Sequence, residues 1–244
     1  MDRPKPILRS AHDPKAPNTV RFVCISDTHN LTDHLSVPLG DVLLHAGDFS
    51  MVGSPDEVRH FDAFLAKLPH PVKVVIAGNH EITFDIGKYQ KNRSRFPLQN
   101  VDNPRTAKEL LRHCTYLEDS QIHVFGYTIV GSPWVHCSGW AFHCPTRAEI
   151  AQKWAQLPGH TDILLTHMPP YRVLDADLTS GDPSGCPHLL AKVREIKPIV
   201  HVFGHMHEGQ GVLHTEETMF VNASVCNYEY QPVNLPTVFD LPIR

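Results

Sequence analysis

Five apolar runs in this chain each finish at an aspartate, an asparagine or a histidine. The runs cover residues 20–26, 42–46, 72–77, 163–166 and 199–203, and the polar residues that follow are Asp27, Asp48, Asn79, His167 and His205. Short apolar runs bounded by glycine or proline indicate buried strands. Ligands of open α/β sheets bind beyond the carboxyl ends of the strands. The pattern therefore predicts an α/β protein with one crowded polar site at one edge of a sheet.

A helix signal lies between the second and third of these runs. Ser54 and Glu57 form a Ser-x-x-Glu capping box, and apolar residues then recur on one face from Val58 to Leu68. We therefore expect a helix over residues 54–68. A strand, a helix and a strand of this length form a βαβ unit, so the second and third strands are expected to be parallel.

Weaker signals predict the remaining elements. We expect helices over residues 103–113, 146–156 and 187–196, a hairpin over 121–130, an irregular segment over 82–102, and late strands at 219–223 and 237–241, the last at a sheet edge. Four prolines in the first 17 residues predict that residues 1–19 form an extended surface arm. Residues 20–244 show no repeat and no low-complexity linker, so we expect them to form a single domain.

Charge and composition narrow the classes of function. The net charge of −4 and the pI of about 6.5 disfavour tight binding to long nucleic acids. No apolar stretch reaches about 18 residues and no signal peptide opens the sequence, so we expect a cytoplasmic protein that does not bind membranes. The six cysteines are scattered, which is typical of free thiols, with a Cys137–Cys144 disulfide as the alternative.

Seven residues at or beside the strand ends carry side chains that bind divalent metals. They are Asp27, His29, Asp48, Asn79, His167, His205 and His207. Imidazole nitrogen and carboxylate or amide oxygen suit Mn, Fe, Zn, Ni or Co, whereas softer sites use cysteine, which is absent from these motifs. Seven donors are too many for one tetrahedral ion, so the set suits two ions that share a carboxylate. His45 and His201 lie inside predicted strands, where packing or support of a ligand is the better interpretation.

The same residues resemble the motifs of the calcineurin-like metallophosphoesterases. These motifs are Asp27-x-His29, Gly47-Asp48, Gly78-Asn79-His80-Glu81, His167 and Gly204-His205-x-His207, in that order. A further likeness is to the metallophosphoesterase-domain-containing subgroup, in Gly131-Ser132-Pro133-Trp134, Trp140-Ala141-Phe142 and Val221-Asn222-Ala223-Ser224. The resemblance spans about residues 20–243.

The resemblance implies a fold and a ligand set. The fold would be a four-layer αββα sandwich, in which two mixed β-sheets are flanked by helices. One ion would be held by Asp27, His29, Asp48 and His207, and the other by Asp48, Asn79, His167 and His205. His80 would face the leaving group, and Glu81 would orient His80.

The implied activity is that of a phosphodiesterase with two divalent metals, Mn²⁺ being the first choice. A water activated as hydroxide would attack the phosphodiester in line, with no phosphoenzyme. Many family members that cleave monoesters carry Asp-Arg-Gly after the bridging aspartate, but here Asp48 is followed by Phe49-Ser50. The missing arginine favours a diester substrate, and the subgroup resemblance points to a cyclic nucleotide such as cAMP or cGMP. A promiscuous diesterase is the close alternative.

Substrate contacts are predicted at Asn79, His80, Ser132 and Trp134. The loop that holds Trp134 also holds Trp140 and Phe142, and these aromatic residues form either core or a wall for base stacking. The basic residues of 88–95 are interpreted as a solvated face, with binding of an anionic substrate as the alternative.

Two other classes of function remain open at this stage. One is a scaffold or binding protein on a metallophosphoesterase fold with vestigial catalysis, which the complete ligand set disfavours. The other is a nuclease for single-stranded nucleic acid, which the acidic balance disfavours. Protein partners cannot be inferred from these motifs.

Overall fold

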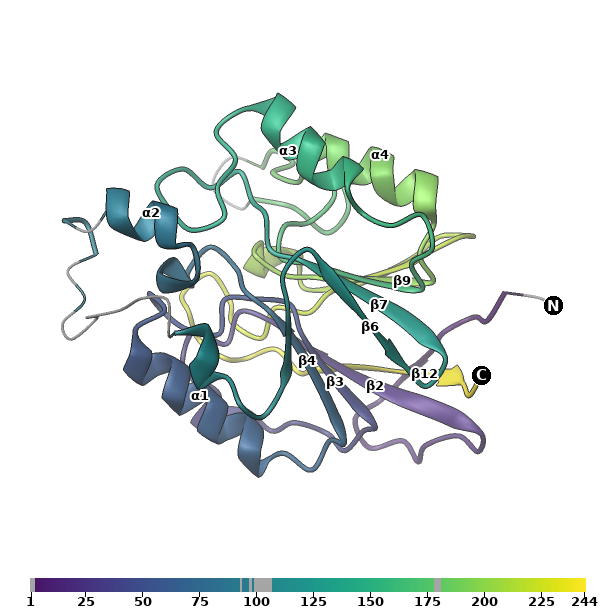
Figure 1. The fold of residues 1–244 in the computed structure, drawn as a ribbon. Helices are drawn as coiled ribbons and strands as arrows, with labels where there is room; N and C mark the ends of the chain where they lie inside the picture. Colours follow the sequence, from purple (N-terminus) through teal and green to yellow (C-terminus); the bar gives the residue numbers. More distant parts are fainter. Residues whose placement is uncertain (1–2, 93, 97, 99–106, 178–180) are drawn as a thin grey trace.

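Two mixed six-stranded β-sheets face one another, and helices cover their outer faces (Figure 1). The computed structural model describes residues 3–92, 94–96, 98, 107–177 and 181–244. Helix α1 (Pro55–Lys67) covers the first sheet, and α3 (Arg147–Ala155) and α4 (Pro187–Ile196) cover the second. The four layers confirm the predicted αββα sandwich.

The first sheet has the strand order β1-β12-β2-β3-β4-β5. Its strands are β1 (Ile7–Arg9), β12 (Thr237–Pro242), β2 (Thr19–Ile25), β3 (Val42–His45), β4 (Val72–Ile76) and β5 (Thr115–Leu117). Strands β2 to β5 run parallel, and β12 and β1 are antiparallel to their neighbours. The predicted parallel pairing on either side of α1 is therefore confirmed.

The second sheet has the order β10-β11-β9-β8-β7-β6. Its strands are β10 (Gly211–His214), β11 (Met219–Asn222), β9 (Val200–Phe203), β8 (Ile163–Thr166), β7 (Tyr127–Ser132) and β6 (Ser120–Val124). Strands β7, β8, β9 and β11 are parallel, whereas β6 and β10 close the two edges as antiparallel strands. Strands β6 and β7 confirm the predicted hairpin.

The core follows the two-residue period of the strands. Phe22 and Cys24 of β2 pack between the sheets, whereas Val23 and Ile25 pack in the layer that includes α1. In β8 the alternation is the same, with Leu164 facing the layer of α3 and α4. Runs that are buried on both faces therefore belong to strands covered from both sides, which is why the sequence shows them as continuously apolar.

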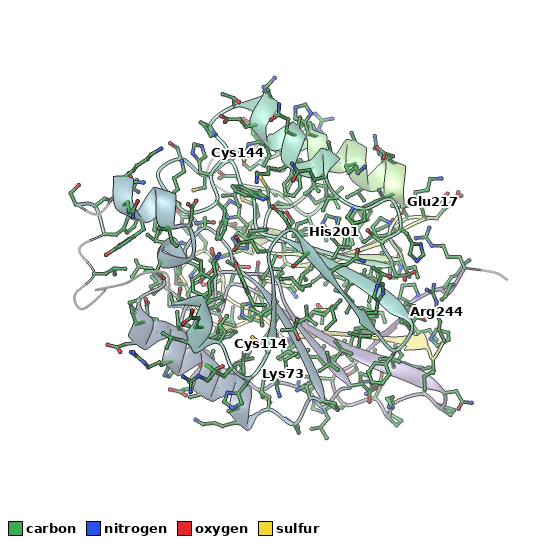
Figure 2. The ribbon with its side chains drawn as sticks, viewed as in Figure 1. Lys73, Cys114, Cys144, His201, Glu217 and Arg244 are labelled. Carbon is green, nitrogen blue, oxygen red and sulfur yellow. The ribbon has the colours of Figure 1, made fainter. Side chains whose placement is uncertain are left out.

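Two histidines inside strands confirm the structural interpretation. His201 of β9 is completely buried and lies between the second sheet and its helices (Figure 2), with Nε2 2.8 Å from Thr166 Oγ1. His45 of β3 is equally buried, with Nε2 3.1 Å from Thr28 Oγ1. Burial lowers the pKa of each ring to about 3, so both are neutral at pH 7. All six cysteines are free, which excludes the alternative disulfide in this structure.

Three predicted elements differ from the structure. The strand at 237–241 was expected at a sheet edge, but β12 lies between β1 and β2, because residues 7–9 of the expected arm supply the edge strand. The segment 82–102 contains a 3-10 helix (Ile82–Phe84) and helix α2 (Ile86–Lys91). The expected helix over 103–113 begins outside the described residues, and the part within them holds only a 3-10 helix (Lys108–Leu110) before β5.

A buried carboxylate attaches the N-terminal residues to the first sheet. Asp240 of β12 accepts hydrogen bonds from Arg21 Nε at 2.8 Å, from Arg9 Nε at 3.0 Å and from the Ala16 N–H at 3.3 Å. Asp240 is fully buried and Arg21 nearly so. Burial raises the pKa of Asp240, but the hydrogen bonds from Arg21 outweigh it, and the pKa is lowered from its ordinary value. The pair therefore stabilises the fold above the unfolded-state pKa, and this contribution is lost as the pH falls through the folded-state pKa.

We predict that Asp240→Ala lowers the free energy of unfolding by about 3–5 kcal/mol at pH 7, because it leaves the Arg21 guanidinium buried without its partner. Urea denaturation of the purified protein measures this loss. Asp56→Ala is the matched control, since Asp56 pairs with Arg59 on the exposed face of α1, and such pairs contribute about 0–1 kcal/mol. A loss below about 1 kcal/mol for Asp240→Ala would contradict the role given to this pair.

Candidate metal centre

The strand ends that carry the predicted ligands turn through an uncommon backbone conformation. Asp27, His29, Asp48 and His205 have φ angles of 54°, 42°, 53° and 70°. A positive φ is costly for residues with a side chain, and such residues concentrate at functional sites. Backbone hydrogen bonds hold the turns, with the Asp27 N–H 2.9 Å from the Gly47 oxygen and the His29 N–H 3.0 Å from the Asp48 oxygen. The loops after β2 and β3 therefore support one another.

Two glycines let these loops approach closely. A Cβ at Gly78 would overlap the Asp48 carboxylate, and a Cβ at Gly204 would overlap the Asp27 carboxylate. Glycine is therefore required before Asn79 and before His205, because any side chain at these two positions would displace the neighbouring carboxylate.

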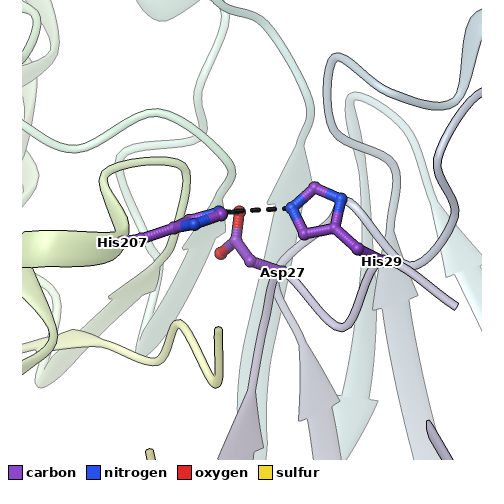
Figure 3. A group of neighbouring side chains, drawn as sticks. All are labelled: Asp27, His29 and His207. Atoms are coloured by element: carbon purple, nitrogen blue, oxygen red, sulfur yellow. Dashed lines mark hydrogen bonds and ion pairs between the residues drawn. The ribbon is translucent and has the colours of Figure 1, made fainter. Parts of the chain in front are cut away.

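Asp27, His29 and His207 form the first group of donors (Figure 3). His29 Nε2 and His207 Nε2 lie 3.2 Å apart, and His207 Nε2 lies 3.4 Å from Asp27 Oδ1. Asp27 is completely buried, and its carboxylate accepts hydrogen bonds from Ser224 Oγ at 2.8 Å and from the His205 N–H at 3.0 Å. These contacts join the end of β2 in the first sheet to loops of the second.

Asp48, His167 and His205 form the second group, and Asn79 lies beside them. His167 Nε2 lies 3.1 Å from Asp48 Oδ2 and 3.1 Å from Asn79 Oδ1. Asp48 also belongs to a group with His29 and His80, so its carboxylate lies between the two sets of donors. The structure thus brings together all seven predicted ligands.

The donors fit divalent cations. His167 Nδ1 pairs with the Ala46 carbonyl and His207 Nδ1 with the Asn227 carbonyl, both at 2.8 Å, so each ring directs Nε2 into the site. This backbone pairing of the outer nitrogen is the usual way in which proteins orient a metal-binding histidine. The converging atoms are nitrogens and oxygens, as Mn, Zn or Fe require.

The pKa values of the ligand histidines in the metal-free protein also fit cation binding. Burial lowers the pKa of His29 to about 4 and of His205 to about 3, so both rings are neutral at pH 7 and can bind a cation. Burial also disfavours the charged forms of His207 and His167, but Asp27 and Asp48 outweigh it and raise both pKa values to about 9. A metal ion at these two rings would therefore displace a proton.

His80 faces the same site, and its Nδ1 is also paired with a backbone carbonyl. Its Nδ1 pairs with the Met51 carbonyl at 2.7 Å, and its backbone N–H donates to Asp48 Oδ1 at 2.8 Å. Its Nε2 is left facing Asp48 Oδ2, at 4.0 Å. The ring is thus placed beside the ligands with one nitrogen directed inward.

The described hydrogen bonds of Glu81 go to backbone and to Ser50, and none goes to the ring of His80, so the expected orientation of His80 by Glu81 stays a prediction. Oε2 of Glu81 accepts from the backbone N–H groups of Asp48 at 3.0 Å and Gly78 at 2.6 Å, and Oε1 accepts from the Ser50 N–H at 3.0 Å and Oγ at 2.7 Å. Burial and the charge of Asp48 raise the pKa of Glu81 to about 8. Glu81 is completely buried and fixes the backbone of the loops after β3 and β4.

Ser132 and Trp134 lie away from the site. Ser132 Oγ donates to Asp119 Oδ1 at 2.8 Å, and Trp134 Nε1 donates to Asp119 Oδ2 at 2.8 Å. Lys153 Nζ lies 3.6 Å from the centroid of the Trp134 ring. The predicted substrate contact of these two residues is corrected, because their polar atoms are used to join the β5–β6 turn to the loop after β7.

A cavity of about 520 Å³ opens over the donors. Besides ligands and His80, its lining consists of Cys137, Trp140, Asp177, Met206, Glu208, Tyr228 and Tyr230. Trp140 was one of the aromatic residues considered for this role, whereas Phe142 is core. The two tyrosines were missed, since the sequence around them carries no periodic or motif signal. The described part of the basic segment 88–95 does not line the cavity, and Arg93 lies outside the described residues.

Comparison with known proteins agrees with this geometry. The family model for the calcineurin-like phosphoesterase matches residues 20–209. The chain belongs to the calcineurin-like phosphoesterase family. It is 46% identical over 244 residues to metallophosphoesterase domain-containing protein 1 of Homo sapiens and of Mus musculus, which covers 95% of this chain and 74% of those proteins. It is 41% identical to a UPF0046 protein of Caenorhabditis elegans, over 93% of this chain and 82% of that protein.

A solved structure supports the fold alone. TT1561 of Thermus thermophilus has a TM-score of 0.51 with 11% identity, over 84% of this chain and 88% of that one.

Within the described residues, no helix combines the length and the apolar character that a membrane span requires. As a calcineurin-like phosphoesterase, the chain belongs among the hydrolases of phosphoric esters, and its His and Asp clusters can hold divalent metals.

We predict that Glu81→Ala lowers the free energy of unfolding of the metal-free protein by about 3 kcal/mol or more, because it leaves several buried donors unsatisfied. Chemical denaturation in the presence of a chelator measures it. Glu229→Ala, at an exposed carboxylate, serves as the control. Unchanged stability in Glu81→Ala would mean that the carboxylate does not hold the loops.

We predict that Mn²⁺ at about 100 times its dissociation constant stabilises the chelator-treated protein by about 2.7 kcal/mol for each site. Thermal unfolding with and without Mn²⁺ measures the effect. Asp48→Ala is expected to remove most of it, since this carboxylate lies in both sets of donors. Asp56→Ala, on the exposed face of α1, should leave the effect intact, and an equal loss in both variants would contradict the assignment.

Proposed function

We propose that this chain is a metal-dependent phosphodiesterase for small diesters, with a cyclic nucleotide of the cAMP or cGMP type as the best candidate. The observation that carries the proposal is a complete set of oxygen and nitrogen donors at the floor of one cavity that no described Lys or Arg lines. The donor set supports hydrolysis of a phosphoric ester, and the character of the rim supports a substrate with a low negative charge.

Each residue of the site has a distinct part in the proposed reaction. Two divalent cations, when bound, would polarise the phosphate and lower the pKa of a water molecule that serves as the nucleophile. Asp48 would hold both cations, with Asn79 on one side of it. The Met51 carbonyl accepts the hydrogen bond of His80 Nδ1–H, so His80 would donate from Nε2 to the departing oxygen in its doubly protonated form.

The cavity rim favours diesters over monoesters. A terminal phosphate is a dianion and is best held by a guanidinium fork. Here Phe49, which follows Asp48, is buried in the core. Glu208 lines the cavity, and its charge disfavours a dianion. A diester carries one negative charge fewer, so this charge repels it less.

The size of the cavity and its aromatic residues suit a nucleotide. About 520 Å³ falls in the range of small-molecule sites, roughly 300–1,000 Å³. Tyr228 and Tyr230 lie on the rim, and stacking of a base on an aromatic ring contributes about 1–3 kcal/mol. These features support a small nucleotide as the partner rather than a long nucleic acid, which would need a basic channel.

We predict that the Mn²⁺-loaded protein hydrolyses bis-p-nitrophenyl phosphate at least about 10-fold faster than p-nitrophenyl phosphate, because the rim disfavours the dianion. Steady-state release of p-nitrophenolate by chelator-stripped protein with Mn²⁺ returned measures both rates. Asp48→Ala should lose at least about 100-fold in the diester reaction, whereas Asp56→Ala should not. Hydrolysis of cAMP and cGMP is then compared at the same metal loading.

Two outcomes would overturn the proposal. A preference for the monoester would show that the argument from the missing arginine and the acidic rim is wrong. If the protein binds two metals but hydrolyses no diester, the proposed enzymatic function is wrong. A scaffold or binding protein that keeps its ions for structure would then be favoured.

A further inference from the structure

We propose that Trp140 is a positioning residue for His80, and that it thereby determines how well esters with poor leaving groups are cleaved. The inference rests on the proposed function, because it concerns the stabilisation of the departing oxygen. The two rings are stacked, with their centroids 4.3 Å apart and their planes 29° apart. Trp140 lies in the loop after β7, outside the five metal-ligand motifs.

The hydrogen bonds of His80 leave its ring free to tilt, and packing against Trp140 restricts this tilt. Its Nδ1 is anchored to the Met51 carbonyl at 2.7 Å. A single hydrogen bond fixes the position of Nδ1 but allows the ring to tilt about it, which moves Nε2. The Trp140 indole packs against one face of the imidazole, and the edge-on ring of His29, with its centroid 4.7 Å away, restricts it further. The ring is therefore held with Nε2 directed toward Asp48.

Trp140 is itself held in place. The Arg95 guanidinium lies 5.4 Å from the centroid of the indole, and the Phe96 ring lies 5.2 Å from it. The N–H of the next residue, Ala141, donates to the Asn79 carbonyl at 3.1 Å. The loop that carries Trp140 is thus bonded to the same strand end that carries His80, so the two rings keep their relative position.

The proposed effect depends on the leaving group. In hydrolysis of a diester, the oxygen of water forms the new bond to phosphorus, and the electron pair of the broken bond goes to the departing oxygen. Doubly protonated His80 donates a hydrogen bond from Nε2 to that oxygen and can give it this proton, which leaves a neutral ring whose Nδ1–H stays bonded to the Met51 carbonyl, while the attacking water loses its proton to solvent. A nitrophenolate needs little such help, whereas a more basic phenolate needs much. A misplaced His80 should therefore slow reactions with basic leaving groups selectively.

The experiment compares p-nitrophenyl methyl phosphate with phenyl methyl phosphate, using the Mn²⁺-loaded protein. We expect Trp140→Ala to lower kcat/KM for the phenyl ester by at least about 10-fold and for the nitrophenyl ester by less than about 3-fold. Trp140→Phe should restore most of the loss, because a phenyl ring can stack on the imidazole. Trp134 lies in the same loop but does not line the cavity. Trp134→Phe should therefore leave kcat/KM for both esters at the wild-type value.

A double variant tests whether Trp140 acts through His80. In a His80→Ala background, Trp140→Ala should cause no further loss with either ester, because the residue that it positions is absent. An equal loss with both esters, or a further loss in the His80→Ala background, would overturn the proposal.

An NMR measurement that does not depend on catalysis tests this inference separately from the proposed function. In the metal-free protein, the carbon-bound ring protons of His80, assigned by their loss in His80→Ala, should show an upfield NMR shift from the indole ring current. The shift should vanish in Trp140→Ala and persist in Trp134→Phe. An unchanged shift in Trp140→Ala refutes the positioning, whereas a wild-type protein with the shift but without any diesterase activity refutes only the proposed function.

Discussion

The buried carboxyl group of Glu81 fixes the backbone on which the candidate metal centre depends. It accepts hydrogen bonds from Asp48, Ser50 and Gly78, and so joins the loop after β3 to the loop after β4. Asp48 sits at a positive φ, a conformation that its side chain disfavours. The hydrogen bonds to Glu81 keep this conformation, and the Asp48 carboxylate consequently faces both sets of donors.

Both sheets contribute to the site, so its geometry depends on how the sheets pack. Asp27, Asp48 and Asn79 follow strands of the first sheet, whereas His167 and His205 follow strands of the second. The apolar core between the sheets holds these two sets within hydrogen-bonding distance. Protein interiors are as densely packed as organic crystals, so a change of volume in this core would be transmitted to the donors.

Aromatic residues outside the ligand set pack around the donors. Trp140 packs on His80, and Tyr230 has its ring centroid 4.7 Å from that of His29 and 5.3 Å from that of His207. In the function proposed here, the acidic rim would act on the charge of the substrate, and the aromatic residues would act on its shape and on its leaving group. The same fold with another rim would thus hold the same metals and select another ester.

The sequence by itself determined the α/β class, the five strand ends and the seven donors. Burial on both faces makes a strand continuously apolar, and a polar residue at its end is then conspicuous. The resemblance of the motifs to a known family added the αββα fold. The tertiary structure alone decided which residues surround the donors. Ser132 and Trp134 donate hydrogen bonds to Asp119, and Glu81 accepts hydrogen bonds from the backbone. Strand β1 pairs with β12 and takes the edge position of the first sheet. These outcomes depend on contacts between residues far apart in the chain, where neither the strand period nor a short motif carries any signal.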